Sequence, residues 1–390
     1  MPYSRKLKYG VNSHQKNAYI ISKSQFPFEI LNGHPGYINL LDALNAWQLV
    51  SELQSSLKLP AAASFKHVSP AGAAVYTPLS DNLARVYGVQ DKNLSHSAIA
   101  YIKARNADPK SSFGDFVALS EHVDKDTALF LKTCVSDGII APSYDDEALD
   151  ILKKKKKGKY IILKADVSFK PPKEEYREVF GLGFRQDRNH VLINHSNSFN
   201  NIITKNKHLT EDAKRDLILA AITLKYTQSN SVGFALQGQM IGIGAGQQSR
   251  IDCVKLAGNK ALTWYLRQHP KVNSLSFKPN IKSVAKLNAQ IQYIEDDFTE
   301  LEYNIFKQLF VTRPLPLSPF EKQQFIELLD EVCLSSDAFF PFRDNIDRAS
   351  KFGVKYIIQP GGSVQDNHII DAANDYNMCM CFNGIRLFHH

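Results

Sequence analysis

A chain of 390 residues, with 44 % apolar and 22 % charged residues, is long enough for two or three structural units with a substantial core. The formal net charge of +8 suits anionic small molecules as well as nucleic acid, and much of the excess lies in one lysine run at 153–157. Five cysteines without Cys-x-x-Cys spacing exclude a disulfide framework and a zinc site, and without a signal peptide or a membrane-length apolar stretch we expect a cytoplasmic protein with no membrane partner.

Alternating helices and strands are predicted along the first half. The segment at 1–20 is either a tethered loop or a ligand-contacting arm. A helix at 37–53 has apolar residues at helical spacing, among them Leu40, Ala43 and Trp47. A strand at 61–65 leads into Lys66 and His67, and the small residues that follow predict a turn that opens a helix. The next elements are a helix at 96–105, a strand ending at 119, a helix at 124–135 capped by Asp124, a strand at 135–142 and a helix at 145–157.

The lysine run ends the last of these helices. Cations are favourable at a helix C-terminus, so we interpret the run as a solvated helix end and expect no nucleic-acid partner. The proline-containing region at 165–207 is predicted to be a crossing connection with some strand. The second half has a helix at 210–225, a hairpin turn at Gly238 and Gln239, a helix-rich region at 252–333, a helix at 347–352, a strand at 354–359, a helix at 366–376 and a final strand.

Lys66 and His67 are adjacent at the end of a predicted strand. His67 can transfer a proton near neutral pH, and Lys66 supplies a positive charge. Small residues after the pair allow a ligand to approach the backbone, and free amides at a helix start favour anions. Such a pair is also common at purely structural positions, so these residues alone leave both interpretations open.

A faint internal repeat relates the two halves. Residues 66–75 can be laid over 225–234, and 136–142 over 336–341. Extra chain in the helix-rich region accounts for the wider separation of the second pair. The identity is low enough that chance similarity stays an alternative. If the repeat is real, two similar α/β units each contribute loops at the strand ends, where ligands of open α/β sheets bind.

Several common enzyme motifs are missing. Gly242, Gly244 and Gly246 suggest a dinucleotide fingerprint, but the third glycine of that motif would fall at Gln247. A P-loop, the motifs of a zinc deaminase and a nucleophile elbow are absent from the sequence. What remains is a set of small-residue turns with Lys, His, Asn, Arg and Asp, which suits a polar, planar, anionic ligand and proton transfer by one histidine.

Five motifs, at 66–73, 136–142, 225–231, 244–250 and 336–344, together resemble the transformylase part of the AICAR transformylase/IMP cyclohydrolase family. The resemblance runs in order from Leu7 to the C-terminal residues 386–390. It implies an α/β fold of two similar three-layer units, of the cytidine-deaminase-like kind. We expect the units at 1–195 and 196–390, with a helical insertion at about 262–333 in the second.

The chain departs from the family pattern in two places. Bifunctional members carry a cyclohydrolase domain before this point, so we expect a monofunctional protein without cyclohydrolase activity. Lys8 stands where the family has arginine, which keeps the charge but loses the two-pronged contact that arginine makes with a phosphate. Ser13 stands where proline is usual.

The resemblance implies formyl transfer from 10-formyltetrahydrofolate to the 5-amino group of AICAR, giving FAICAR and tetrahydrofolate in purine biosynthesis. His67 matches the residue that transfers a proton. Lys66 matches the residue that stabilises the oxyanion and protonates the leaving group, and Asn230 matches the residue that positions the amine or polarises the formyl group. Matches to AICAR contacts are Lys8, Tyr9, Gly114, Asp137, Phe339 and Arg386, and matches to folate contacts are Arg250, Ile251, Asp344, Ser363 and Val364.

The resemblance further implies a homodimer with active sites at its interface and a potassium ion near Asp337. Two other functions stay open at this point. A non-catalytic paralogue would bind purine nucleotides without turnover, and a nucleic-acid binder would use the net positive charge. The intact Lys66, His67 and Asn230 set favours the enzyme, and the clustering of the lysines disfavours nucleic-acid binding.

Overall fold

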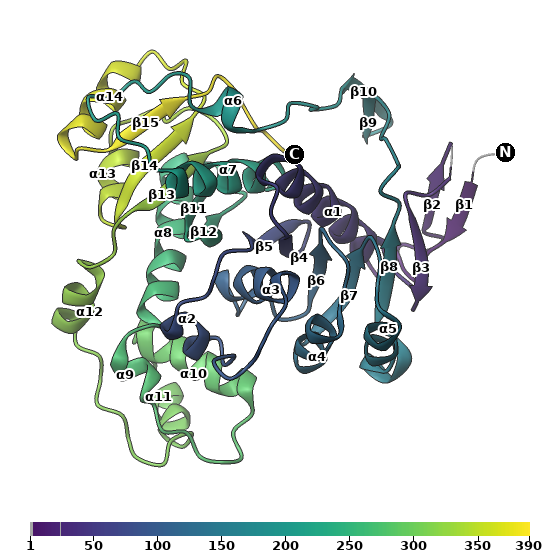
Figure 1. The fold of residues 1–390 in the computed structure, drawn as a ribbon, viewed down its shortest axis with the longest axis horizontal. Coiled ribbons are helices and arrows are strands. Elements are labelled where there is room, and N and C mark those ends of the chain that lie inside the picture. Colours follow the sequence, from purple (N-terminus) through teal and green to yellow (C-terminus); the bar gives the residue numbers. More distant parts are fainter. Residues whose placement is uncertain (1–2, 24) are drawn as a thin grey trace.

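The computed structural model describes residues 3–23 and 25–390 and shows an α/β protein built on a large mixed sheet (Figure 1). The strands are β1 (Tyr3–Lys6), β2 (Tyr19–Ser22), β3 (Phe28–Asn32), β4 (Ala61–Lys66), β5 (Ser69–Val75), β6 (Asp115–Leu119), β7 (Ser136–Ala141), β8 (Ile161–Ala165), β9 (Glu174–Val179), β10 (Leu182–Asp187), β11 (Val232–Leu236), β12 (Gln239–Gly244), β13 (Val332–Ser336), β14 (Val354–Gln359) and β15 (Cys379–Phe382). Eleven of them form one sheet in the order β15-β14-β13-β11-β12-β5-β4-β6-β7-β8-β3.

Fourteen helices lie among the described residues. They are α1 (Tyr37–Leu57), α2 (Asp81–Val86), α3 (His96–Ala107), α4 (Lys125–Thr133), α5 (Asp146–Lys153), α6 (His195–Ser198), α7 (Glu211–Lys225), α8 (Arg250–Leu266), α9 (Pro270–Asn273), α10 (Ser283–Glu295), α11 (Glu300–Lys307), α12 (Pro319–Ile326), α13 (Asp344–Ser350) and α14 (Asp366–Asp375). None of the helices in this part of the chain is long and apolar enough to cross a membrane.

The sheet is covered by helices on both faces. Successive residues of a strand point to opposite faces, so Ala61, Ala63 and Phe65 of β4 join the cluster of α1 and α7, whereas Ala62 joins that of α3, α4 and α5. In the second half, α8, α13 and α14 pack on the face opposite α7. The result is three layers, with α1 and α7 together on one face (Figure 1).

The same order of elements occurs twice along the chain. From α1 to β8, apart from the short α2, the order is helix, strand, strand, helix, strand, helix, strand, helix, strand. From α7 to β15, apart from α9–α12, the order is the same. One sheet continues through both halves, because β5 pairs with β12 between Ala74 and Gln239. Buried Lys103 of α3 also donates from Nζ to the Gln237 carbonyl at 2.8 Å. Division at 195 and the cytidine-deaminase-like arrangement stay predictions.

The predicted alignment of the repeat is wrong in register. Lys66 ends a strand, whereas Lys225 ends a helix; Ser136 begins β7, whereas Ser336 ends β13. By the order of elements, the β4–β5 hairpin of the first half instead corresponds to the β11–β12 hairpin of the second half. The predicted alignment matched similar residue types, but Lys and Ser-Asp lie at the ends of different kinds of elements in the two halves.

The turn after Lys66 does not open a helix. It is a two-residue hairpin turn, His67 and Val68, that joins β4 directly to β5. Two smaller predictions also change. α5 ends at Lys153, before a 3₁₀ turn in which Lys156 and Lys157 adopt positive φ, and α13 begins at Asp344, ahead of the predicted start. Helix α7 was predictable because Thr210 caps it, accepting from Ala213 N at 3.1 Å.

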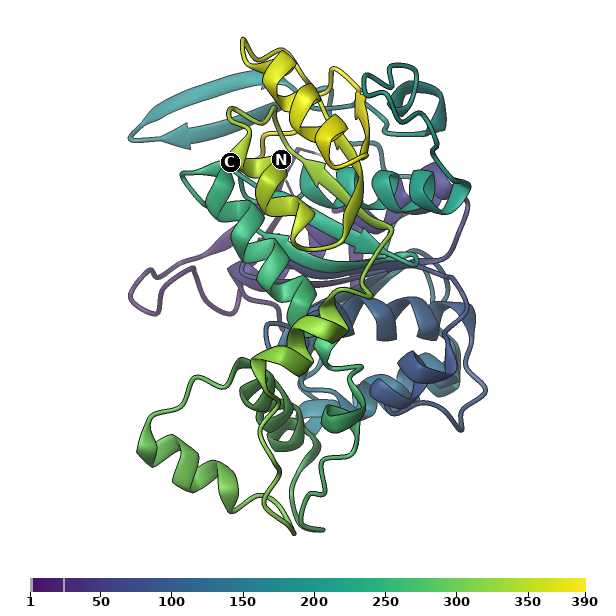
Figure 2. The same ribbon diagram turned by 90° about the vertical axis from the view of Figure 1, so that its left-hand side faces the viewer.

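Two parts stand away from the layered body (Figures 1 and 2). The stretch expected to hold a helical insertion contains the end of α8 and α9–α12, which pack around their own core of Tyr293, Phe306 and Phe310. The β9–β10 ribbon extends from the connection at 165–207 and pairs only with itself. An isolated two-stranded ribbon of this kind is only marginally stable in water.

Candidate active site

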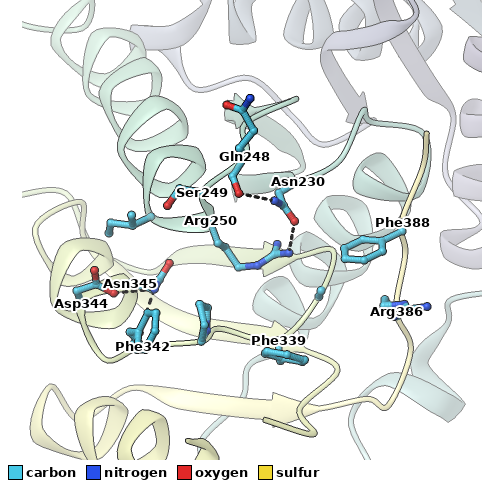
Figure 3. Close-up of a pocket in the computed structure, with 13 residues that line it drawn as sticks. Asn230, Gln248, Ser249, Arg250, Phe339, Phe342, Asp344, Asn345, Arg386 and Phe388 are labelled. Carbon is cyan, nitrogen blue, oxygen red and sulfur yellow. Dashed lines mark hydrogen bonds between the residues drawn. The ribbon is translucent and has the colours of Figure 1, made fainter.

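One cavity of about 430 Å³ gathers predicted residues from several parts of the second half (Figure 3). It lies between the loop before β11, the start of α8, the loop after β13 and the C-terminal segment. Six predicted site residues line it: Asn230, Arg250, Ile251, Phe339, Asp344 and Arg386. Residues predicted to contact AICAR and residues predicted to contact folate therefore share one cavity.

Arg250 organises the inner wall of this cavity. Its Nη2 donates to Asn230 Oδ1 at 2.7 Å, and its Nη1 forms an ion pair with Asp337 and donates to Ser336 Oγ at 3.0 Å. Asp337 is 0 % exposed and Arg250 is 7 % exposed, so this is a buried charge pair. Predicted as a folate contact, Arg250 is thus also the group that neutralises Asp337 and orients the Asn230 amide.

The Asn230 side chain is held at both ends. Its Nδ2 donates to the carbonyl oxygens of Gln247 and Gln248, at 3.0 and 3.2 Å, while its Oδ1 accepts from Arg250. The neighbouring Ser229 and Ser231 hydroxyls donate to Asp337 Oδ2 at 2.7 and 3.1 Å. A side chain held in this way can orient a ligand without titrating.

The cavity mouth is aromatic and charged. Phe339, Phe342 and Phe388 are exposed large apolar residues, and the Arg386 guanidinium lies 4.9 Å from the Phe388 ring centroid. Figure 3 places Phe388 and Arg386 at one end and Asp344 at the other. Exposed rings beside a guanidinium can stack on a planar ligand and pair with its anionic group. Ser363 and Val364 follow β14 and are not among the residues that line this cavity.

Lys66 and His67 lie in a different hollow, of about 390 Å³, lined also by Ser69, Ser111 and Lys260. Lys66 Nζ donates to the Phe113 carbonyl at 2.5 Å, which places the lysine beside Gly114. Among the described residues, the His67 ring makes no hydrogen bond. The imidazole is exposed and available to a ligand.

Three further predicted residues lie near this hairpin. Tyr9 donates to Asn39 Oδ1 at 2.8 Å, and its pKa is raised by burial and by the nearby Asp137 carboxylate. Asp137 forms an ion pair with Lys156, a member of the lysine run interpreted as solvated. Lys8 Nζ lies 5.9 Å from the Tyr9 ring centroid.

Asp42 lies beside the β4–β5 hairpin with these residues, and the sequence did not predict it as a site residue. It is buried on α1 and its Oδ1 accepts from Val68 N at 2.6 Å. Burial raises its pKa to about 6, an effect opposed by the hydrogen bond from Val68 and reinforced by the Asp137 and Asp115 carboxylates. The available signal was a carboxylate between Leu40 and Ala43 on the buried face of a predicted helix.

Both clusters lie at the same edge of the sheet. Lys66 ends β4 and Asn230 precedes β11, and in the order β11-β12-β5-β4 these two strands are three strand spacings apart, which is about 14 Å. Gln228 N donates to Ser69 Oγ at 3.4 Å across this gap. The two hollows share no lining residue. Within one chain, the predicted proton-transfer residue His67 and the cavity therefore lie side by side and not around a single point.

Comparison with known proteins gives a consistent picture. A family model described as "AICARFT/IMPCHase bienzyme" matches residues 1–260. Relatives named bifunctional purine biosynthesis protein PurH include those of Persephonella marina, 31 % identical over 400 residues, Elusimicrobium minutum, 31 % over 385, and Aquifex aeolicus, 30 % over 396. These alignments cover 98–100 % of this chain, and the chain spans about 60 % of the length of the relatives.

Proposed function

The chain belongs to the AICARFT/IMPCHase bienzyme family, and from that premise we propose that it is an AICAR transformylase. It would transfer the formyl group of 10-formyltetrahydrofolate to the 5-amino group of AICAR. The observation that carries the proposal is the pairing, at one sheet edge, of an exposed histidine beside a lysine with an aromatic and cationic cavity. The relatives' name places the family in purine biosynthesis.

The chemistry requires a base, a positive charge and precise orientation. The AICAR amine is a poor nucleophile because its lone pair is conjugated with the ring. His67 would accept the amine proton as the new nitrogen–carbon bond forms. Lys66 Nζ would stabilise the oxygen of the tetrahedral intermediate. When that intermediate collapses, the bond from the formyl carbon to the folate nitrogen breaks, and this nitrogen would take a proton from the Lys66 ammonium. The amine proton would remain on His67 until it is released to solvent, and Lys66 would regain its proton from solvent.

The cavity suits the two substrates. Arg386 would pair with an anionic group, and Phe339 and Phe388 would stack on planar rings. Arg250 holds the Asn230 amide, which would orient the amine or the formyl oxygen. Asp344 lines the same cavity and would accept hydrogen bonds from a heterocycle. Folate contacts by Ile251, Ser363 and Val364 stay predictions.

The potassium ion expected near Asp337 also stays a prediction. The buried Asp337 carboxylate is paired with Arg250 and accepts from Ser229 and Ser231. Charge balance at this carboxylate therefore does not require a further cation, and no catalytic step is assigned to the ion.

We further propose a homodimer in which the hairpin cluster of one copy meets the cavity of the other. Two observations support it. Within one chain, the hollow that holds Lys66 and His67 shares no lining residue with the cavity that holds Asn230. The β9–β10 ribbon also exposes Phe180, Leu182 and Phe184, and exposed apolar patches of this kind mark interaction sites.

Substituting Phe180 and Phe184 together by aspartate should convert the dimer to a monomer and lower turnover by at least about tenfold, since two charges replace apolar contacts. Light scattering after size exclusion measures the mass, and an AICAR assay measures the rate. Leu315→Asp places a charge at another exposed apolar site, in the segment between α11 and α12, and should change neither quantity. A doubly substituted protein that stays dimeric would exclude the ribbon from the interface.

Incubation of the protein with AICAR and 10-formyltetrahydrofolate tests the function itself. Tetrahydrofolate is followed by absorbance, and the products are separated so that FAICAR is distinguished from IMP. FAICAR alone is the expected product. IMP would show that the chain also performs the cyclohydrolase step. Calorimetric binding of AICAR without turnover would replace the enzyme with a nucleotide-binding protein.

A further inference from the structure

The turn that carries His67 has an unusual backbone for its residues. His67 and Val68 have φ values of +54° and +62°, both in the left-handed region. A two-residue hairpin with two positive φ values is of the type I′ kind, which favours Asn-Gly or Asp-Gly. Valine is β-branched and rarely adopts this conformation. Local preference therefore opposes the turn, and another interaction must hold it.

Asp42 supplies that interaction from α1. Its Oδ1 accepts the Val68 backbone N–H at 2.6 Å, and its carboxylate is buried. No lysine or arginine forms an ion pair with Asp42 in the described part of the chain. The carboxylates that face it, Asp137 and Asp115, are paired with Lys156 and Arg105. The hydrogen bond to the turn is thus the main favourable contact of a buried charge.

The second half of the chain contains an equivalent turn, held by an equivalent hydrogen bond from a helix carboxylate, but with different residues. The β11–β12 turn consists of Gln237 and Gly238, with φ values of +54° and +77°, and Gly238 N donates to Asp216 Oδ1 at 2.8 Å. Asp216 is the sixth residue of α7, as Asp42 is the sixth residue of α1. There, glycine occupies the strained position and no acid–base residue is present. The first half differs by placing histidine and valine in the turn.

We propose that Asp42 is a positioning residue that holds the His67–Val68 turn, and with it the imidazole, in the geometry required for proton transfer. The inference rests on the proposed function. Because the His67 ring has no hydrogen-bond partner among the described residues, its placement depends on the backbone. We call the hydrogen bond from Val68 N to Asp42 Oδ1 the clamp. Lys66 is fixed separately by the Phe113 carbonyl, so the clamp acts on His67 more than on Lys66.

The test combines loss of the clamp with relief of the strain. Asp42→Ala should lower kcat by about 10²-fold, since a misplaced catalytic group costs rates of this order, while KM for AICAR changes by less than about threefold. Asp42→Asn keeps an acceptor oxygen and should lose less. The double variant Asp42→Ala/Val68→Gly should recover at least about tenfold of the lost kcat, because glycine adopts the left-handed conformation without a clamp.

Asp216→Ala is the matched control in the second half, because it removes the hydrogen bond to the Gly238 N–H as Asp42→Ala removes that to Val68. It alters the equivalent clamp on a turn without an acid–base residue, so kcat should stay within about twofold of the parent value even if the melting temperature falls. Asp42→Ala that melts cooperatively with an unchanged kcat would overturn the proposal. So would a double variant that recovers no activity.

Hydrogen exchange of the peptide spanning the β4–β5 turn gives a readout independent of turnover. Asp42→Ala should accelerate exchange at this turn, and Val68→Gly should partly reverse the acceleration. If the parent protein shows no formyl transfer, the proposed function fails, whereas unchanged exchange in Asp42→Ala refutes the clamp. The two failures are therefore distinguishable.

Discussion

His67→Ala should lower the rate of formyl transfer by about 10²–10⁴-fold, the usual contribution of a positioned acid or base. In the proposed mechanism, removal of the imidazole leaves the amine proton without an acceptor, and Lys66 cannot take this role while it carries its positive charge. The β4–β5 turn is held through the backbone, so the fold should be unaffected. Steady-state rates at saturating AICAR and folate measure the loss, and KM should change little.

The matched control is His122→Ala. His122 is also exposed, but it follows β6 at the opposite edge of the sheet, where it contacts Ser143 and Asp145 at 2.8 and 2.6 Å. Its loss should leave the rate within about twofold, as for other surface substitutions remote from the site. If His67→Ala keeps the parent rate, proton transfer must be assigned to another group.

Arg250→Met should destabilise the folded protein by about 3–5 kcal/mol, because it leaves the Asp337 carboxylate buried without its cation. The double variant Arg250→Met/Asp337→Asn removes both charges and should recover most of that loss. Urea unfolding at one fixed protein concentration measures both free energies of unfolding, since the stability of the proposed dimer would depend on concentration.

Stability and catalysis should separate in this pair of variants. The double variant still lacks the Arg250 contact that holds Asn230 Oδ1, so its formyl transfer should stay low although its fold is restored. If the free energy of unfolding of the single Arg250→Met variant lies within about 1 kcal/mol of the parent value, the Asp337 charge must be compensated by another group. Recovery of both stability and turnover in the double variant would remove Arg250 from the site.

Elements with strong local signals were predictable from the sequence. Strand 354–359 forms with the bounds expected from its apolar run, and Asp124 caps α4 by accepting from Thr127 N at 2.8 Å. The turn after Lys66 was not predictable, because His-Val opposes a type I′ hairpin and the group that holds it, Asp42, lies on another element. A long-range hydrogen bond of this kind overrides local preference.

In the candidate site, too, features with a local sequence signal were predictable and features set by the assembled fold were not. Sequence motifs selected the residues that line the cavity and the hairpin, because each motif is a local pattern. Their separation into two clusters depends on β12 and β5 lying between β11 and β4, and strand order is a property of the assembled sheet. The pairing of Arg250 with Asp337, across α8 and the end of β13, was hidden for the same reason.

A heterodimer of two inactive variants tests most directly whether this chain is a transformylase with a site shared between two copies. His67→Ala breaks the hairpin cluster and Asn230→Ala breaks the cavity, and each homodimer should be inactive. In the heterodimer, isolated by two different tags, one of two symmetry-related shared sites is intact, so formyl transfer to AICAR should reach about half of the parent rate. A heterodimer no more active than the two inactive parents would contradict the shared site.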